Sequence, residues 1–99
     1  MTDFSALIAA DARLVILKEL AAQTDGRLNE TLLTATLDAF GIRRSREFVR
    51  TQIRALAELG AVTASEAGTV MIAAITRTGL DHVERRAVLD GVARPSPEE

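Results

Sequence analysis

Glycines divide this chain into segments that can form only short helices and strands. Six glycines are spread along the 99 residues, and both prolines stand near the C-terminus. Glycine has no Cβ and is favoured where a helix or strand ends in a turn. The expected breaks are Asp25-Gly26, Gly41, Gly60, Gly68, Gly79 and Gly91, with Pro95 and Pro97 confined to a tail. A chain of this length forms one domain with one core.

Capping residues and apolar spacing predict four helices between these breaks, or five if the first is divided. Ala and Leu dominate from about Asp3 to Ala22, where Asp11 could act as an internal N-cap and begin a second helix, Ala12 to Ala22. Each later helix follows a side chain that can accept hydrogen bonds from the first turn. These helices are Glu30–Phe40 after Asn29, Arg46–Leu59 after Ser45, and Arg77 to about Leu89 after Thr76, the last with Leu80, Val83 and Ala87 inward.

Two β-branched segments after Gly60 predict a β-hairpin. Ala61–Ser65 and Thr69–Ile75 are joined by Glu66-Ala67-Gly68, whose glycine suits a tight turn, whereas Arg27-Leu28 is too short to assign. Two helices joined by a short turn, then the hairpin and a last helix, follow the order of a winged helix-turn-helix. We therefore expect a mainly α fold with a small antiparallel hairpin over residues 1–90. Residues 91–99 are expected to form an extended or disordered tail.

Composition restricts both the core and the chemistry. Aromatic residues make up 3% of the chain and cysteine is absent, so the core must be aliphatic and thiolate chemistry is excluded. No phosphate-binding loop or catalytic triad spacing is present. Asp81 and His82 are neighbours on a helix and point about 100° apart, which makes a poor metal site, so His82 is expected to be a partly exposed helix residue. We expect no enzyme activity, cofactor or metal, and no membrane segment or secretion signal.

The first predicted helix is apolar on more than one side. Ile16, Leu17 and Leu20 form one face, and Leu7, Ile8 and Val15 fall largely on the opposite side. The second set could complete the core. It could equally form a homodimer contact, together with the last helix. The sequence leaves both possibilities open.

A cluster of arginines is the feature that points to function. Residues 42–54 contain five arginines and one acid, Glu47, so this segment carries +4, while the remaining seven basic and thirteen acidic residues carry −6. One interpretation is a solvated helix face with ion pairs at i, i+3 and i+4 spacing. The other, which we favour because so many arginines exceed what solubility requires, is contact with duplex DNA.

The expected DNA contacts fall into two sets. Arg46, Arg50, Thr51 and Arg54 lie on the outer arc of the third helix, where arginine can donate to guanine edges and Glu47 can accept from a cytosine amino group. Arg43, Arg44 and Ser45 precede that helix, where side chains and N-terminal amides can bind phosphate. The expected interface is therefore Arg43, Arg44, Ser45, Arg46, Glu47, Arg50, Thr51 and Arg54.

The predicted hairpin tip argues for a different partner. Residues 65–69 include an acid, Glu66, and no lysine or arginine, so phosphate would be repelled rather than attracted there. Winged helices bind proteins as well as DNA. The alternative function is therefore a winged-helix module that binds another protein rather than DNA.

Several short stretches carry a family resemblance. Leu56-Ala-Glu-Leu-Gly-Ala-Val62 resembles the end of the recognition helix in bacterial winged-helix regulators, and Ile75-Thr-Arg-Thr-Gly79 resembles their strand-to-helix corner. Nearly the whole chain is similar to small winged-helix proteins of Mu-like prophages, described as regulators of the ArsR type. The supporting stretches are Asp11-Ala-Arg-Leu-Val-Ile-Leu17, Leu28-Asn-Glu-Thr-Leu-Leu33 and Gly91-Val-Ala-Arg-Pro-Ser-Pro97. The resemblance implies a DNA-binding regulator in the cytoplasm of a bacterial host. For the alternative function, it implies a module that binds a protein of phage packaging or assembly.

Overall fold

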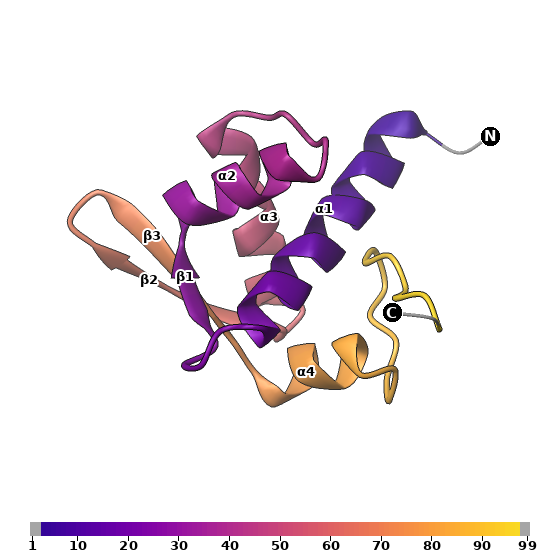
Figure 1. Ribbon diagram of the computed structural model, residues 1–99. Helices are drawn as coiled ribbons and strands as arrows, with labels where there is room; N and C mark the ends of the chain where they lie inside the picture. The colour runs from indigo at the N-terminus through magenta and orange to yellow at the C-terminus, as the bar shows by residue number, and fades with distance from the viewer. Residues whose placement is uncertain (1–2, 98–99) are drawn as a thin grey trace.

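A three-stranded antiparallel sheet packs beside three helices that contact one another, within residues 3–97, the part of the chain that the computed structural model describes (Figure 1). The elements are α1 (Phe4–Ala21), β1 (Arg27–Asn29), α2 (Glu30–Ala39), α3 (Arg46–Glu58), β2 (Val62–Ala67), β3 (Val70–Ile75) and α4 (Arg77–Val83). The described chain is thus a small α+β domain of four helices and three strands.

The three later caps predicted from the sequence are confirmed. The side chain of Asn29 accepts from the Leu32 amide at 2.8 Å, and the Ser45 hydroxyl accepts from the Phe48 amide at 3.1 Å. Thr76 accepts from the Gly79 amide at 3.2 Å. These caps set the first residues of α2, α3 and α4, because each satisfies an amide that has no partner within its helix.

The first helix is continuous, so the division at Asp11 is wrong. Asp3 caps α1 by accepting from the Ser5 amide, and the helix then runs without a break to Ala21. Asp11 lies exposed in its middle. An aspartate that projects into water from a helix interior has no free amide to cap, so it does not interrupt the hydrogen-bonding ladder.

The sheet contains a strand that the sequence did not reveal. Arg27–Asn29 forms β1, which pairs antiparallel with β3, so the strand order is β1-β3-β2. Three residues are too few to show an alternating pattern, and β1 exists because β3 offers it an edge. The hairpin itself is confirmed with shifted bounds, because Val62 to Ala67 all pair with β3 and the turn falls at Gly68 and Thr69.

The last helix is shorter than predicted, and the side chain of Ala87 is exposed rather than inward. Helix α4 ends at Val83, and Arg85 then adopts a left-handed backbone conformation with φ of 65°. His82 is fully buried, which corrects the expected partly exposed residue. Its Nδ1 accepts from the Leu89 amide at 3.1 Å and its Nε2–H donates to the Ala93 carbonyl at 2.9 Å, so His82 holds the segment after α4 to the body.

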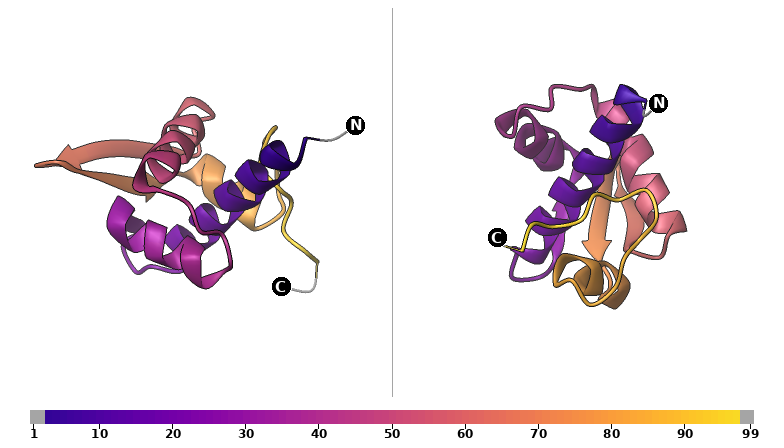
Figure 2. Two further views of the ribbon diagram at one scale, coloured as in Figure 1. Left: turned by 90° about the horizontal axis from the view of Figure 1, so that it is seen from above. Right: turned by 90° about the vertical axis from the view of Figure 1, so that its right-hand side faces the viewer.

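The C-terminal segment crosses α1, as the right-hand view of Figure 2 shows. Arg13 donates to the Gly91 carbonyl at 3.0 Å, and the Ala93 amide donates to the Ala10 carbonyl at 3.1 Å. Val92 is buried between these contacts. Residues 91–97 therefore contain no helix or strand, and the first of them are packed against the domain.

Aliphatic side chains form the core, as the scarcity of aromatic residues predicted. Members from α1, α2 and α3 that are at most 1% exposed include Ile16, Leu17, Leu20, Leu33, Leu37, Val49, Ile53 and Leu56. Leu32 of α2 and Phe40, which follows α2, are apolar but exposed. With α1, α2 and α3 joined through this core, the β2–β3 hairpin extends beyond the helices (Figures 1 and 2).

Candidate nucleic-acid interface

The candidate interface is built on the connection between α2 and α3. Gly41 has a φ of +86°, and the following Ile42 amide donates to the Leu37 carbonyl at 2.8 Å. This left-handed turn closes α2 in a conformation that glycine adopts without strain. Ile42 is half-buried, while the next three residues are exposed. The chain therefore presents Arg43, Arg44 and Ser45 to solvent just before α3 begins.

The two arginines of this connection remain available to a ligand. The Nε atom of Arg43 lies 2.8 Å from Asp38, but its side chain is 86% exposed, and exposed ion pairs of this kind contribute little free energy. Arg44 lies over the ring of Phe48, with 5.9 Å from its guanidinium carbon to the ring centre. Both border an open groove of about 460 Å³ between α2 and the connection. Phosphate could therefore be bound there without breaking a buried contact.

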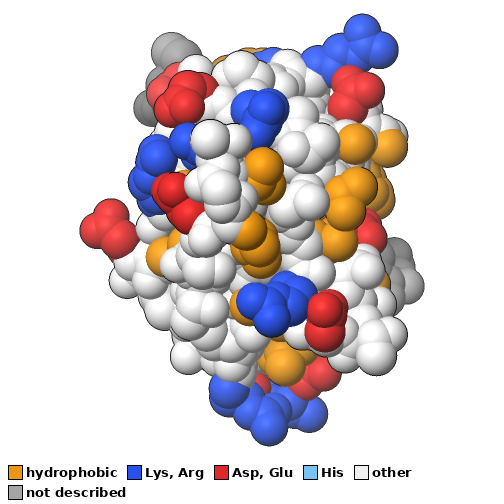
Figure 3. All heavy atoms as spheres, turned by 90° about the vertical axis from the view of Figure 1, so that its left-hand side faces the viewer, with side chains coloured by type: hydrophobic (Ala, Val, Ile, Leu, Met, Phe, Trp, Pro, Cys, Tyr) orange, Lys and Arg blue, Asp and Glu red, His pale blue; other side chains and the backbone are white. Residues whose placement is uncertain are grey.

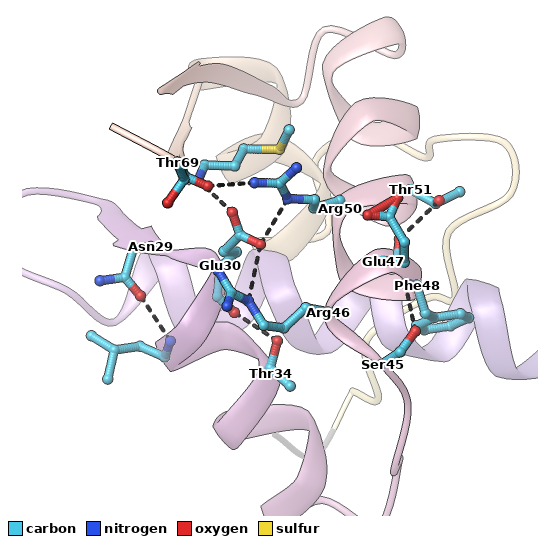
Figure 4. A network of polar contacts seen from close by, with 12 residues as sticks. Asn29, Glu30, Thr34, Ser45, Arg46, Glu47, Phe48, Arg50, Thr51 and Thr69 are labelled. Atoms are coloured by element: carbon cyan, nitrogen blue, oxygen red, sulfur yellow. Dashed lines mark hydrogen bonds and ion pairs between the residues drawn. The ribbon is translucent and has the colours of Figure 1, made fainter. Parts of the chain in front are cut away.

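Two arginines of α3 have an internal partner instead (Figure 4). Glu30, the first residue of α2, is fully buried, and its Oε1 accepts from Arg50 Nε at 2.8 Å and from Arg46 Nε at 3.3 Å. Its Oε2 accepts from the Met71 amide of β3. Arg50 also donates to the Thr69 carbonyl at 2.6 Å. We call these five residues the Glu30 network; it joins α2, α3 and the β2–β3 hairpin.

The network holds Glu30 ionised. The pKa of Glu30 is lowered from 4.5 to about 2, and the hydrogen bond from Arg50 is the largest cause. The Met71 amide and the charges of both arginines act in the same direction, whereas burial raises the pKa. The same hydrogen bond raises the pKa of Arg50 above its ordinary value. Both partners are therefore charged at neutral pH.

The other residues of the predicted site lie on the exposed arc of α3. Glu47, Thr51 and Arg54 are exposed, and Glu47 and Thr51 lie on the side of the helix turned away from Glu30 (Figure 4). The Thr51 hydroxyl donates to the Glu47 carbonyl at 3.0 Å. The structure thus places Arg43, Arg44, Ser45, Glu47, Thr51 and Arg54 on the surface, whereas Arg50 is directed inward and Arg46 is shared between Glu30 and solvent.

Charge on the hairpin side of the molecule is mixed. Figure 3 shows basic side chains in separate groups with acidic ones between them, and no continuous basic patch on that face. Glu66 is exposed on β2, and the turn at Gly68 and Thr69 brings no arginine or lysine. Electrostatic attraction to a polyanion would therefore come from α3 and the connection before it, rather than from the hairpin tip.

Sequence reasoning missed Glu30, although a signal was present. Glu30, Leu33 and Leu37 are spaced i, i+3 and i+7, so they share one face of α2, and both leucines are buried. An acid on an apolar helix face must find donors, because burying an unpaired charge is costly. The donors, Arg46 and Arg50, lie on the neighbouring helix α3, and only the packing of α2 against α3 brings them to Glu30.

Other kinds of site are not seen in the described chain. Residues 3–97 contain no group of three His, Asp or Glu side chains placed to hold a metal ion. Within the same range, no helix is both long and apolar enough to cross a membrane.

The fold and the site together define a small α+β domain with arginines on α3 and on the connection before it, beside an extended hairpin. Over 91 residues the chain is 40% identical to the "Uncharacterized protein gp26" of Escherichia phage Mu, with 92% of this chain and 94% of that protein covered. The chain belongs to the family of this Mu phage protein, which confirms the Mu-like part of the resemblance. Comparison with protein-family models and with solved structures finds no match.

Proposed function

We propose that this phage-family domain is a winged helix-turn-helix that binds duplex DNA and regulates transcription. The observation that carries the proposal is the exposed basic set of Arg43, Arg44 and Arg54, arranged around the capped N-terminus and outer arc of α3. In this arrangement α2 and α3 form the helix-turn-helix and the β2–β3 hairpin forms the wing. Support comes from the order of elements, the short connection before α3 and the charge of +4 on residues 42–54.

The Glu30 network changes the roles expected of individual arginines. Arg43, Arg44 and the amides behind Ser45 are proposed to bind phosphate, and Arg54 with Glu47 and Thr51 to face the base edges. Arg50 does not read bases in this proposal, because its side chain is only 23% exposed and is bonded to Glu30 and Thr69. Arg46, with 54% of its side chain exposed, can share a phosphate with its internal partner.

Selection of binding sites from random duplexes at moderate salt tests the proposal. We expect wild type to enrich a defined site, and Arg54→Ala to lose about 1–3 kcal/mol of binding free energy on that site only. Arg43→Ala/Arg44→Ala should weaken binding to all sequences and reduce the slope of log K against log salt concentration by about two units. Arg77→Ala is the matched control, since Arg77 is an exposed arginine of α4 outside the interface. Arg50→Ala is unsuitable because it would leave the buried Glu30 charge without its main donor.

The outcome that contradicts DNA binding also identifies the alternative. If wild type enriches no duplex and the arginine variants match it, the proposal fails. Recovery of a phage packaging or assembly protein in that case would favour the protein-binding function. Direct contact of such a partner with the same surface would be shown by loss of capture in Arg43→Ala/Arg44→Ala.

We also propose that two copies pair through the outer face of α1. Phe4 and Leu7 are 71% and 53% exposed, and the first turns of α1 extend beyond the body (Figure 1). On the same face, Val15, Lys18 and Glu19 line a pocket of about 190 Å³ together with Phe40, which follows α2. An antiparallel two-fold pairing would place Phe4 of each copy in the pocket of the other. Helix α4 packs against α1 and ends at Val83, so the proposal rests on α1 rather than on both terminal helices.

The size of this surface predicts a weak dimer. At about 200 Å² per phenylalanine side chain, the exposed fractions of Phe4 and Phe40 (71% and 65%) give about 270 Å² per copy. A stable interface buries about 800 Å² per partner, and Leu7, Ile8 and Val15 add only part of the difference. Association at micromolar concentrations is therefore expected, tighter only when both copies are bound to one DNA duplex.

A further inference from the structure

We propose that Glu30 is a positioning residue of the DNA interface, which withholds Arg50 and part of Arg46 from phosphate and fixes the hairpin turn beside α3. This inference rests on the proposed function. It gives a role to the one buried carboxylate of the described chain, and it follows from the geometry of the bonds that Glu30 accepts.

Both oxygens of Glu30 are occupied by donors from other elements. One accepts from Arg50 and Arg46 of α3, the other from the Met71 amide of β3. A fully buried carboxylate that loses a donor cannot replace it with water, so the free energy of breaking these bonds is high. The shorter bond, 2.8 Å, is made to the less exposed side chain, Arg50, and the longer, 3.3 Å, to Arg46. Arg50 is therefore held and Arg46 is only restrained.

Arg50 extends the effect of Glu30 to the hairpin. Its Nε donates to Glu30 while another nitrogen of the same guanidinium donates to the Thr69 carbonyl at 2.6 Å. A guanidinium is planar, so fixing one edge on Glu30 fixes the direction in which the other edge points. The β2–β3 turn thereby has a set position relative to α3, and a duplex that contacts both elements must fit that spacing.

Withholding arginines has a measurable consequence for DNA binding. Each phosphate neutralised by a protein steepens the dependence of log K on log salt concentration by about 0.9 units. With Arg50 and Arg46 bonded to Glu30, this dependence reports mainly Arg43 and Arg44. Replacing Glu30 by a neutral side chain would release up to two guanidinium groups to phosphates of any sequence, so non-specific affinity should rise and selectivity should fall.

The experiment compares wild type, Glu30→Gln and Glu58→Gln, each checked for folding by circular dichroism, on a selected duplex and a scrambled one at several salt concentrations. For Glu30→Gln we expect the salt slope to steepen by about one to two units and binding of the scrambled duplex at about 50 mM salt to tighten roughly tenfold. Glu58 is exposed at the end of α3, so Glu58→Gln removes the same charge without releasing an arginine and should leave the slope unchanged.

A purely structural role for Glu30 predicts weaker rather than tighter DNA binding by Glu30→Gln. Loss of stability alone would weaken binding to both duplexes without a steeper slope. In the folded Glu30→Gln variant, amide exchange at Met71 should also accelerate, because its acceptor is weakened. Should Glu30→Gln fail to fold, Glu30→Gln/Arg50→Gln keeps neutral hydrogen-bonding groups at both positions, and its slope should steepen by about one unit through Arg46.

The outcomes separate the two proposals. An unchanged slope in a folded variant overturns the role of Glu30 while DNA binding by wild type stands. Absence of duplex binding by wild type itself overturns the proposed function, and the role of Glu30 in DNA binding with it. A steeper slope together with lost discrimination between the two duplexes supports both.

Discussion

The stability that the Glu30 carboxylate gives to the fold depends on pH. Because its pKa is lowered from 4.5 to about 2, the unfolded chain binds more protons than the folded one between these values. The stabilising contribution of Glu30 is therefore complete above pH 4.5 and is lost as the pH falls toward 2. Arg50 stays charged throughout this range, so Glu30 is the partner of the pair that titrates.

We expect the unfolding free energy of wild type to fall more steeply between pH 5 and 2.5 than that of Glu30→Gln. The difference in slope should correspond to the uptake of up to one additional proton on unfolding. Urea unfolding at a series of pH values measures this difference. Glu58→Gln serves as the control, since Glu58 is exposed and should leave the pH dependence close to that of wild type. Parallel profiles for wild type and Glu30→Gln would contradict the ionised state assigned to Glu30.

At the scale of elements, short segments depend on side chains from their neighbours. Helix α4 has only seven residues, too few to be stable alone. It begins at the Thr76 cap, and its buried residue His82 bonds the two following backbone groups, the Leu89 amide and the Ala93 carbonyl. Since a carbonyl only accepts and an amide only donates, these partners select the neutral ring with its proton on Nε2.

His82→Leu tests whether His82 holds the segment that follows α4. The substitution keeps an apolar side chain in the core but leaves the Leu89 amide and Ala93 carbonyl without their partner, at a cost of about 2–4 kcal/mol for the two groups. Urea unfolding measures the loss, and amide exchange at Leu89 should accelerate more than exchange at Ile53 in the core. His82→Gln, which can restore one of the bonds, should be less affected. Equal protection of Leu89 in all variants would show that the segment is held by other contacts.

At the scale of the whole molecule, the outer face of α1 determines whether two domains can act together. Asp11 lies exposed between Phe4 and Val15 on this face, so an antiparallel pairing brings the two Asp11 carboxylates close to the two-fold axis. Like charges at such a position oppose association. The proposed dimer can therefore be both weakened and strengthened by single substitutions.

Sedimentation or light scattering at tens of micromolar should show a dimer for wild type and mostly monomer for Phe4→Ser. Asp11→Asn should dimerise about threefold more tightly, because removing the repulsion between the two carboxylates is worth up to about 1 kcal/mol in a high dielectric. Leu32→Ser is the matched control, an exposed leucine on α2 that does not line the α1 pocket. If Phe4→Ser and Leu32→Ser behave like wild type, the surface on α1 is not a dimer contact.

Local chemistry was enough to predict much of this domain from its sequence. Capping by Asn29, Ser45 and Thr76, the turn at Gly41, and the paired strands after Gly60 all depend on residues within a few positions of one another. The aliphatic core followed from the lack of aromatic residues. The exposed positions of Arg43, Arg44 and Arg54 also followed from helix periodicity and the short connection before α3.

Tertiary structure alone decided the features that join distant residues. Strand β1 forms because β3 presents an edge to it, and α4 ends at Val83 because His82 binds the returning chain. Arg50 is directed inward because Glu30, 20 residues earlier, lies on a helix packed against α3. A sequence pattern records which side chains share a face of one element. It does not record the angle and distance between two elements, and those determine whether an arginine meets water, a phosphate or a buried carboxylate.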